Sequence, residues 1–150
     1  MMLKQGMSSF VNMTSSFCII HGVEVNTCNI LRNKVDNLVK NGRLSKLIGT
    51  VVGLLNIRMV GEASKTGTLE LLQKARGQKK AIKAAFDELI KAGYNGGHIT
   101  IAHRNNEKFI EQFSELVREK FARAMIEVLP TSGLCSFYAE EGGLLMGYEI

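Results

Sequence analysis

Residues 77–130 alternate between helical and extended periodicity, and this alternation restricts the fold more than any other feature of the chain. The first helical segment opens at Gly77 and ends at Gly93, and Asn105 or Asn106 can cap the second, with Glu107 in its first turn. HITIAH (98–103) alternates as half-buried strands do, and the strand AMIEVLP follows the second helix. Two apolar faces recur at helical spacing: Ala81, Ile82, Ala85, Phe86, Leu89 and Ile90, then Phe109, Ile110, Phe113, Leu116, Val117 and Phe121.

Further segments on both sides of this stretch complete the predicted order. Val35, Leu38 and Val39 indicate a helix that stops at Asn41-Gly42, whereas residues 1–26 show no clear period and are expected to be irregular. LLNIRMVG and TLELLQKA predict a hairpin with Gly67 in its connection, and LLMGYEI predicts a last strand after a loop rich in glycine and serine. The order helix, hairpin, helix, strand, helix, strand, strand is typical of the α/β (α+β) class, with a sheet and helices in two layers.

The composition sets broad limits on function. The chain has 150 residues, 45% of them hydrophobic, which is enough for one packed domain or one half of a larger protein. The net charge of +5 suits phosphate, anionic lipid or nucleic acid as partners, and equally suits solubility alone. The 3 cysteines form no CxxC pair, and no apolar run approaches the length of a membrane span. We therefore expect reduced thiols and a cytoplasmic protein.

No residue pattern proposes a reaction. The odd spacing of His98 and His103 points them to opposite faces of a strand, without the converging ligands that a metal needs. The sequence contains no nucleophile elbow, dinucleotide-binding fingerprint or phosphate-binding loop. We therefore expect no catalytic residue, no metal, no cofactor and no enzyme activity of the chain alone.

The basic stretch KARGQKKAIK (74–83) is open to two interpretations. It could bind nucleic acid weakly, but no aromatic side chains interleave to stack on bases, so a solvated helix face is favoured. Arg76 differs from these lysines because it precedes Gly77 at a helix entry, just as Arg43 follows Gly42 at another. A helix amino terminus with an adjacent arginine suits a carboxylate or phosphate, and also suits an ordinary solvated bend.

Two segments carry a family resemblance. LVKNGRLSKLIGTVVGLLNIRMVG and GTLELLQKARGQKKAI resemble the GGRIS-like turn and the K-x-RG-x-KKA helix entry of the DegV family of bacterial fatty-acid-binding proteins. The order and spacing match from about Thr27 to the end, through HITIAHRNNEKFIEQFSELVREKFARAMIEVLP. The resemblance implies a mostly antiparallel sheet with helices packed on one face.

The resemblance also implies a function. Family members hold one long-chain fatty acid in an apolar tunnel between two domains and present its carboxylate to a dihydroxyacetone-kinase-like fatty acid kinase for phospholipid synthesis. The turn arginine of the family falls on Arg43 and its helix-entry arginine on Arg76, which implies positions near the head group and the phosphoryl transfer. The chain would then be the substrate carrier, not the enzyme.

Two departures from the family pattern matter. The amino-terminal domain of the family has no counterpart, so residues 27–150 look like a carboxy-terminal domain and residues 1–26 like a remnant. The tunnel face of such a half would be exposed and would favour self-association.

The second departure is in the turn before the last strand. The family's SHTGPG-like turn is FYAEEGG (137–143) here, so its histidine position falls near Ala139, while Gly142 and Gly143 remain. Tyr138 could donate a hydrogen bond to a carboxylate or simply pack, and Glu140 and Glu141 would repel an anion that they faced. The competing function is an interaction module that docks the kinase through Arg43, Arg76 and neighbouring lysines without binding lipid.

Overall fold

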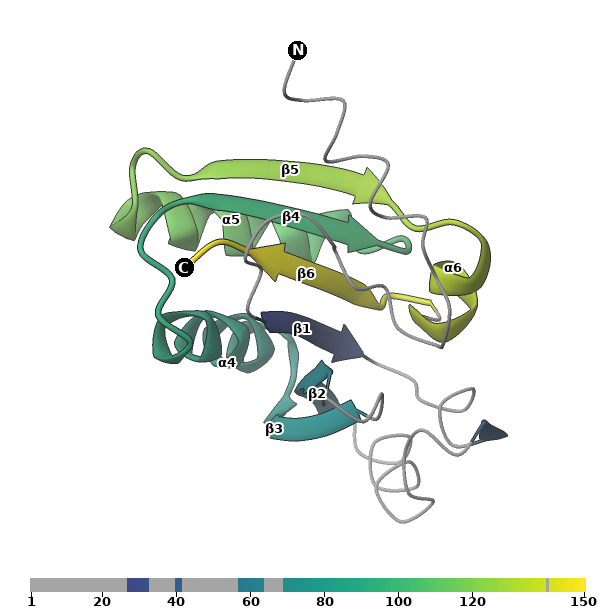
Figure 1. Cartoon of the computed structure of the whole chain (residues 1–150). Helices are drawn as coiled ribbons and strands as arrows, with labels where there is room; N and C mark the ends of the chain where they lie inside the picture. The colour runs from purple at the N-terminus through teal and green to yellow at the C-terminus, as the bar shows by residue number, and fades with distance from the viewer. Residues whose placement is uncertain (1–26, 33–39, 42–56, 64–68, 140) are drawn as a thin grey trace.

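The computed structural model describes residues 27–32, 40–41, 57–63, 69–139 and 141–150 (Figure 1). Its elements, in chain order, are β1 (Thr27–Arg32), β2 (Ile57–Ala63), β3 (Leu69–Arg76), α4 (Gln78–Lys91), β4 (His98–His103), α5 (Glu107–Lys120), β5 (Met125–Pro130), α6 (Gly133–Ala139) and β6 (Leu144–Tyr148).

The strands form one sheet in the order β3-β2-β1-β6-β4-β5. Every pairing is antiparallel except that of β4 with β5, which α5 connects as a crossover. The predicted hairpin is confirmed, because β2 pairs with β3 from Ile57↔Arg76 to Ala63↔Leu69. The mostly antiparallel sheet agrees with the predicted fold class.

Strand β1 was not predicted from the sequence, although it lies in the middle of the sheet. Its residue Leu31 pairs with Val60 of β2 on one side and with Leu144 of β6 on the other. The segment TCNILR is too short to show a clear period, so its extended conformation depends on these two neighbours.

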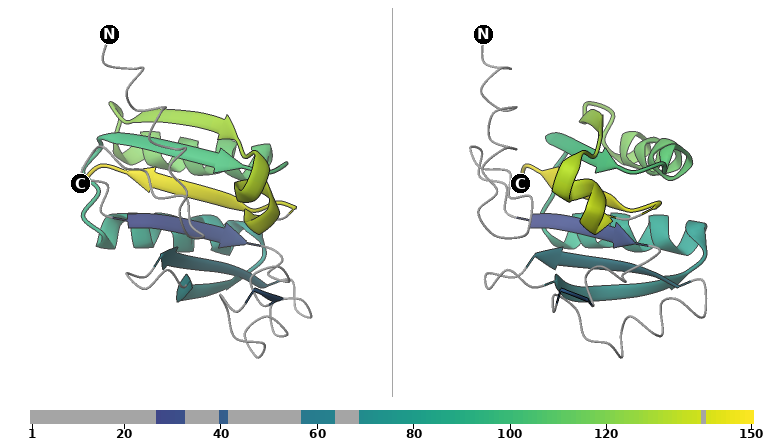
Figure 2. Two further views of the ribbon diagram at one scale, coloured as in Figure 1. Left: turned by 45° about the vertical axis from the view of Figure 1, so that its right-hand side comes forward. Right: turned by 90° about the vertical axis from the view of Figure 1, so that its right-hand side faces the viewer.

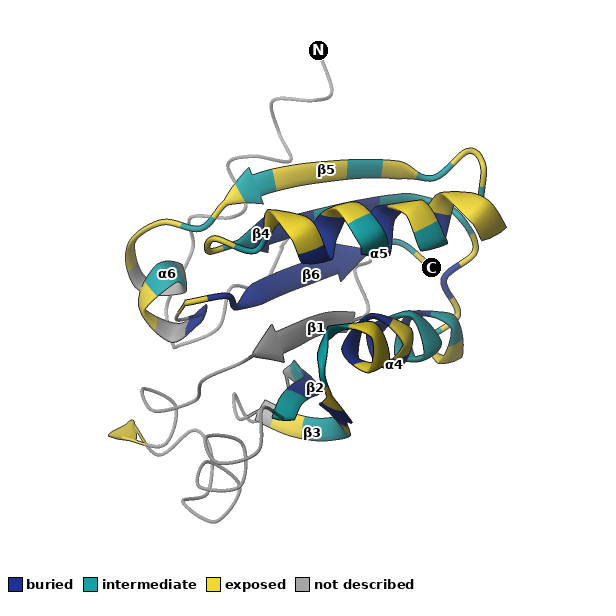
Figure 3. Ribbon diagram, turned by 180° about the vertical axis from the view of Figure 1, so that it is seen from behind, coloured by how far each residue is buried: buried dark blue, intermediate teal, exposed yellow. Residues whose placement is uncertain are grey.

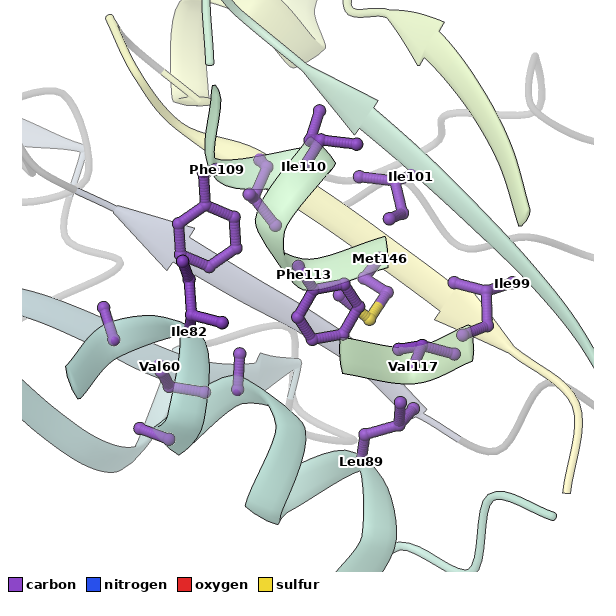
Figure 4. Packing of buried hydrophobic residues seen from close by; sticks show 14 of the residues in the cluster. Val60, Ile82, Leu89, Ile99, Ile101, Phe109, Ile110, Phe113, Val117 and Met146 are labelled. Atoms are coloured by element: carbon purple, nitrogen blue, oxygen red, sulfur yellow. The ribbon is translucent and has the colours of Figure 1, made fainter. Parts of the chain in front are cut away.

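Helices α4 and α5 cover one face of the sheet, as the resemblance implied (Figure 2, Figure 3). Their buried side chains meet strand residues in one apolar cluster, in which Phe109, Phe113 and Leu89 are fully buried (Figure 4). Burying side chains of this size stabilises the fold by about 1.5–3 kcal/mol each. Both predicted helix faces are confirmed in outline, with Phe86, Leu116 and Phe121 only partly buried at their margins.

The helix boundaries follow the predicted signals with one correction. Gly77 precedes α4 with φ 81° and Gly93 follows it with φ 96°, a backbone region that favours glycine. Asn106 occupies the position before α5, but its side chain does not cap the helix. Its Nδ2 instead donates to the carbonyl oxygen of Gly142 at 2.8 Å, so a tertiary contact replaces the predicted local one.

The loop predicted before the last strand is partly wrong, because α6 occupies Gly133–Ala139. Its seven residues are too few to show helical periodicity in the sequence. The helix predicted upstream of Gly42 lies almost wholly outside the described residues. Only Lys40 and Asn41 of this segment are described, and they are helical and in a turn, respectively.

Candidate functional site

One end of the sheet, which we call the α6 end, gathers the polar features of the chain. The pairs His103↔Leu144 and His103↔Pro130 place the ends of β4 and β5 beside the start of β6. Helix α5 begins there because it follows β4, and α6 lies at the same end, whereas α4 begins beside the middle of α5, where Gln78 Nε2 donates to Gln112 Oε1 at 2.9 Å (Figure 1). The amino terminus of α5, with its partial positive charge, therefore lies at this end.

Arg76 is the last residue of β3 and has an exposed side chain. Gly77 follows it, and no side chain caps α4 or places an acidic group in its first turn among the described residues. The arginine therefore lies beside a helix start with free N–H groups, the arrangement that suits an anion. Arg43 and Gly42 lie outside the described residues, so the pairing of the two arginines stays a prediction.

Gly142 and Gly143 form a turn whose backbone geometry excludes larger residues. Gly142 has φ 76°, and a Cβ on Gly143 would lie 1.8 Å from the carbonyl oxygen of Ala139. The turn is joined to the end of β4, because the Arg104 N–H donates to Gly143 at 3.0 Å and the Gly142 N–H donates to Arg104 at 2.9 Å. The end of α6 thus packs directly on the start of β6.

Ala139, near which the resemblance places the family histidine, offers no functional side chain to a ligand. Ala139 is 1% exposed, beneath the turn. Tyr138 lies in the last turn of α6, and Glu140 is outside the described residues. The structure therefore shows no replacement for the histidine at position 139 itself.

The end of β4 supplies polar residues that the sequence analysis did not assign to a site. Asn105 Nδ2 donates to Glu141 Oε1 at 3.0 Å and to Oε2 at 3.3 Å, and Arg104 Nε lies 3.7 Å from Glu141 Oε2. Arg104 Nη1 also donates to the Ser136 carbonyl of α6 at 3.0 Å. The only signal in the sequence was the polar run RNN after a strand, which we had assigned to helix capping.

His103 is fixed by the start of α5. Its Nδ1 accepts a hydrogen bond from the Asn106 N–H at 3.2 Å, which leaves Nε2 as the protonated nitrogen of the neutral ring. His98, at the other end of β4, has Nε2 3.7 Å from Glu127 Oε2. The described residues contain no group of three metal-binding side chains.

A second apolar surface lies on the sheet face away from α4 and α5. Met59, Ala102 and Leu145 are buried but do not belong to the main cluster. Each alternates along its strand with a residue of that cluster, and Ala102 pairs directly with Leu145. Helices α4 and α5 lie on the opposite face, yet these three residues are at most 9% exposed, so the sheet has buried apolar residues on both sides (Figure 2).

The basic stretch 74–83 is a solvated surface. Lys74, Lys79 and Lys80 are exposed, and Lys83 Nζ pairs with Asp87 at 2.8 Å on the same helix. A cation that is already paired contributes less to an external anion. None of the described helices is long and apolar enough to cross a membrane.

The fold belongs to a known class of proteins. The sequence model of the family described as "Uncharacterised protein, DegV family" matches residues 24–148, and the chain therefore belongs to the DegV family.

Particular relatives are close. A DegV domain-containing protein of Streptococcus pneumoniae is 79% identical over 117 residues, which cover 78% of this chain and 42% of that protein. The Streptococcus pneumoniae Fatty Acid Kinase (Fak) B3 protein loaded with linoleic acid has a TM-score of 0.81 and 73% identity, over 85% of this chain and 45% of that one. A DegV family protein from Eubacterium eligens loaded with heptadecanoic acid has a TM-score of 0.77 and 34% identity, over 82% and 45%. The chain thus spans less than half the length of these proteins.

Proposed function

We propose that this chain is the carboxy-terminal part of a DegV-type fatty-acid carrier. The observation that carries the proposal is its 73% identity and TM-score of 0.81 to a protein of the family that holds linoleic acid. The second apolar surface supports it, because a sheet with apolar residues on both faces needs a cover on each. In the complete carrier, this surface would form one wall of the acyl tunnel.

We further propose that the carrier presents its fatty acid to a partner kinase and is not itself an enzyme. The kinase would supply nucleotide and metal, and the carrier would supply positive charge near the transferred phosphoryl group. Arg76 has the exposure and the helix-start position for that role, and Arg43 is assigned to it by the family pattern. Tyr138 is a further candidate donor to the head group. A cytoplasmic location, where such a kinase has nucleotide, is part of this proposal.

The chain alone should bind fatty acid more weakly than a complete carrier. Each methylene transferred from water to an apolar site contributes about 0.8 kcal/mol, so an acyl chain covered on one side loses several kcal/mol. Two copies that joined their second apolar surfaces could restore part of that burial. We therefore propose self-association through this surface.

Native mass spectrometry of the chain purified from bacteria tests the carrier function, followed by lipid extraction and identification. Because the chain alone should bind weakly, we expect less than one co-purifying fatty acid per chain, rising with added oleate to about one per chain or per dimer, with the full-length pneumococcal relative as the positive control. If the relative carries lipid while this chain carries none and takes up none from oleate, the carrier proposal fails for this chain.

The alternative is a module that docks the kinase without holding lipid, and the exposure of Arg76 favours it. The test is a kinase pull-down with Arg43→Ala and Arg76→Ala combined. Lys83→Ala is the matched control, because Lys83 is exposed on α4 and already pairs with Asp87. Loss of binding in the double variant alone supports docking, whereas equal binding by all three proteins contradicts it.

A further inference from the structure

The turn before β6 already holds a carboxylate, and this carboxylate belongs to the chain itself. Both oxygens of Glu141 accept hydrogen bonds from Asn105 Nδ2, at 3.0 and 3.3 Å, and the Arg104 guanidinium lies 3.7 Å away. An amide and a guanidinium are the donors that match the geometry and charge of a carboxylate. The two side chains therefore act as a receptor for a carboxylate in the present structure.

The Arg104 side chain, 43% exposed, has a second hydrogen-bond partner, and no such second partner is seen for the Glu141 side chain among the described residues. Two backbone hydrogen bonds fix Arg104 to the Gly142–Gly143 turn, and its Nη1 is bonded to the Ser136 carbonyl of α6. The Glu141 side chain is 57% exposed. Exposed ion pairs of this kind shift an equilibrium by no more than about five-fold, so Glu141 can leave at low cost.

Asn105 carries backbone strain at this position. It is the only non-glycine residue with positive φ in the described part of the chain, at 51°. Residues in this region are costly and concentrate at ligand-binding and switch sites, and asparagine tolerates it better than most. The strained backbone therefore belongs to Asn105, the same residue whose side-chain amide binds the Glu141 carboxylate.

We propose that Arg104 and Asn105 form the carboxylate-binding site of this chain, that Glu141 occupies it when no ligand is bound, and that a fatty-acid carboxylate displaces Glu141. This inference rests on the proposed carrier function and names the head-group contact. It accounts for binding without a side chain from the buried Ala139. Glu141 then acts as an internal competitor. The apparent affinity for a fatty acid is proportional to the fraction of molecules whose site Glu141 leaves open.

The first test measures oleate affinity by displacement of a fluorescent fatty acid. Glu141→Gln should bind oleate about two- to five-fold more tightly, because it removes the competing charge. Arg104→Gln should weaken binding by about five-fold or more, and Glu141→Gln should bring no gain in that background. Glu111→Gln, which removes the same charge from an exposed position on α5, should match the wild type. Methyl oleate has no charge and should not distinguish the wild type from Glu141→Gln.

The second test uses acetate, so it does not depend on an acyl site. The side-chain amide signal of Asn105 in a ¹H–¹⁵N spectrum should shift with acetate more in Glu141→Gln than in the wild type, relative to equal ionic strength of chloride. If oleate binds with the same affinity to the wild type and Glu141→Gln, the inference fails while the carrier function stands. If acetate shifts Asn105 as expected but no protein binds oleate, the carboxylate site stands and the carrier function fails. An Asn105 signal that acetate leaves unmoved in Glu141→Gln overturns the site in either case.

Discussion

Replacing Gly143 with alanine should destabilise the chain strongly, because the added Cβ has no room. It would lie 1.8 Å from the backbone oxygen of Ala139, and backbone cannot swing aside as a side chain can. The turn would have to move, which strains the two backbone hydrogen bonds that join it to Arg104. Overpacking of this kind costs about 1–3 kcal/mol, and each lost hydrogen bond about 1 kcal/mol more. We expect a total loss of about 4 kcal/mol in the free energy of unfolding.

Urea unfolding followed by far-ultraviolet circular dichroism measures this loss. Gly93→Ala is the matched control, because a Cβ there meets nothing within 4 Å and only the positive φ is strained. That strain costs about 1–2 kcal/mol. The reasoning is refuted if Gly143→Ala is no more destabilised than Gly93→Ala, since the close approach to Ala139 would then carry no cost.

Three further predictions concern buried polar groups. Nε and Nη1 of Arg58 are buried and have no hydrogen-bond partner among the described residues, and burial lowers the pKa of Arg58. Arg58→Met should therefore raise the free energy of unfolding in urea by about 1 kcal/mol, and a loss would contradict this. Burial would raise the pKa of Glu88, but hydrogen bonds from Gln73 and Lys91 outweigh it and lower the pKa. The ionised Glu88 therefore stabilises the folded protein above the pKa of Glu88 in the unfolded chain, and this stabilisation is lost as the pH falls through its pKa in the folded protein. In Glu88→Gln, the free energy of unfolding in urea should depend less on pH in this acid range. Burial raises the pKa of Tyr94 to about 12, so the free energy of unfolding should fall between about pH 10 and pH 12, where Tyr94 ionises in the unfolded chain but not yet in the folded one. Ultraviolet titration of folded Tyr94→Phe should lack the tyrosine that ionises at the highest pH in the wild type.

The periodic elements were predictable because burial and sequence period are directly linked. In α4 and α5 the apolar residues that recur at helical spacing are those that contact the sheet. The alternation of apolar and polar residues likewise predicted β4, in which Ile99 and Ile101 belong to the cluster while Thr100 between them does not. Strand β1 and helix α6 lack such a pattern. The conformation of β1 depends on its two neighbouring strands, and α6 is shorter than two helical turns.

The contacts at the α6 end could not be predicted for a different reason. Asn105 and Glu141 are 36 residues apart, and Asn106 is equally far from Gly142. Neither spacing follows from local propensity, since both depend on the pairing of β4 with β6. Asn106 illustrates the conflict, because its side chain could have capped α5 and instead donates to the turn. Local rules identified the residue but not its partner.

The turn before β6 has to meet two requirements, the backbone geometry of the turn and the contact with a ligand, and different residues can meet them. The two glycines serve the backbone, because Gly142 needs its positive φ and Gly143 needs the close approach to Ala139. These demands arise from folding and hold whatever ligand is bound. Near the place where the resemblance puts the family histidine, the buried Ala139 satisfies the packing. The glycines can therefore persist while the histidine is absent, provided that other donors at the same end of the sheet, such as Arg104 and Asn105, meet the carboxylate.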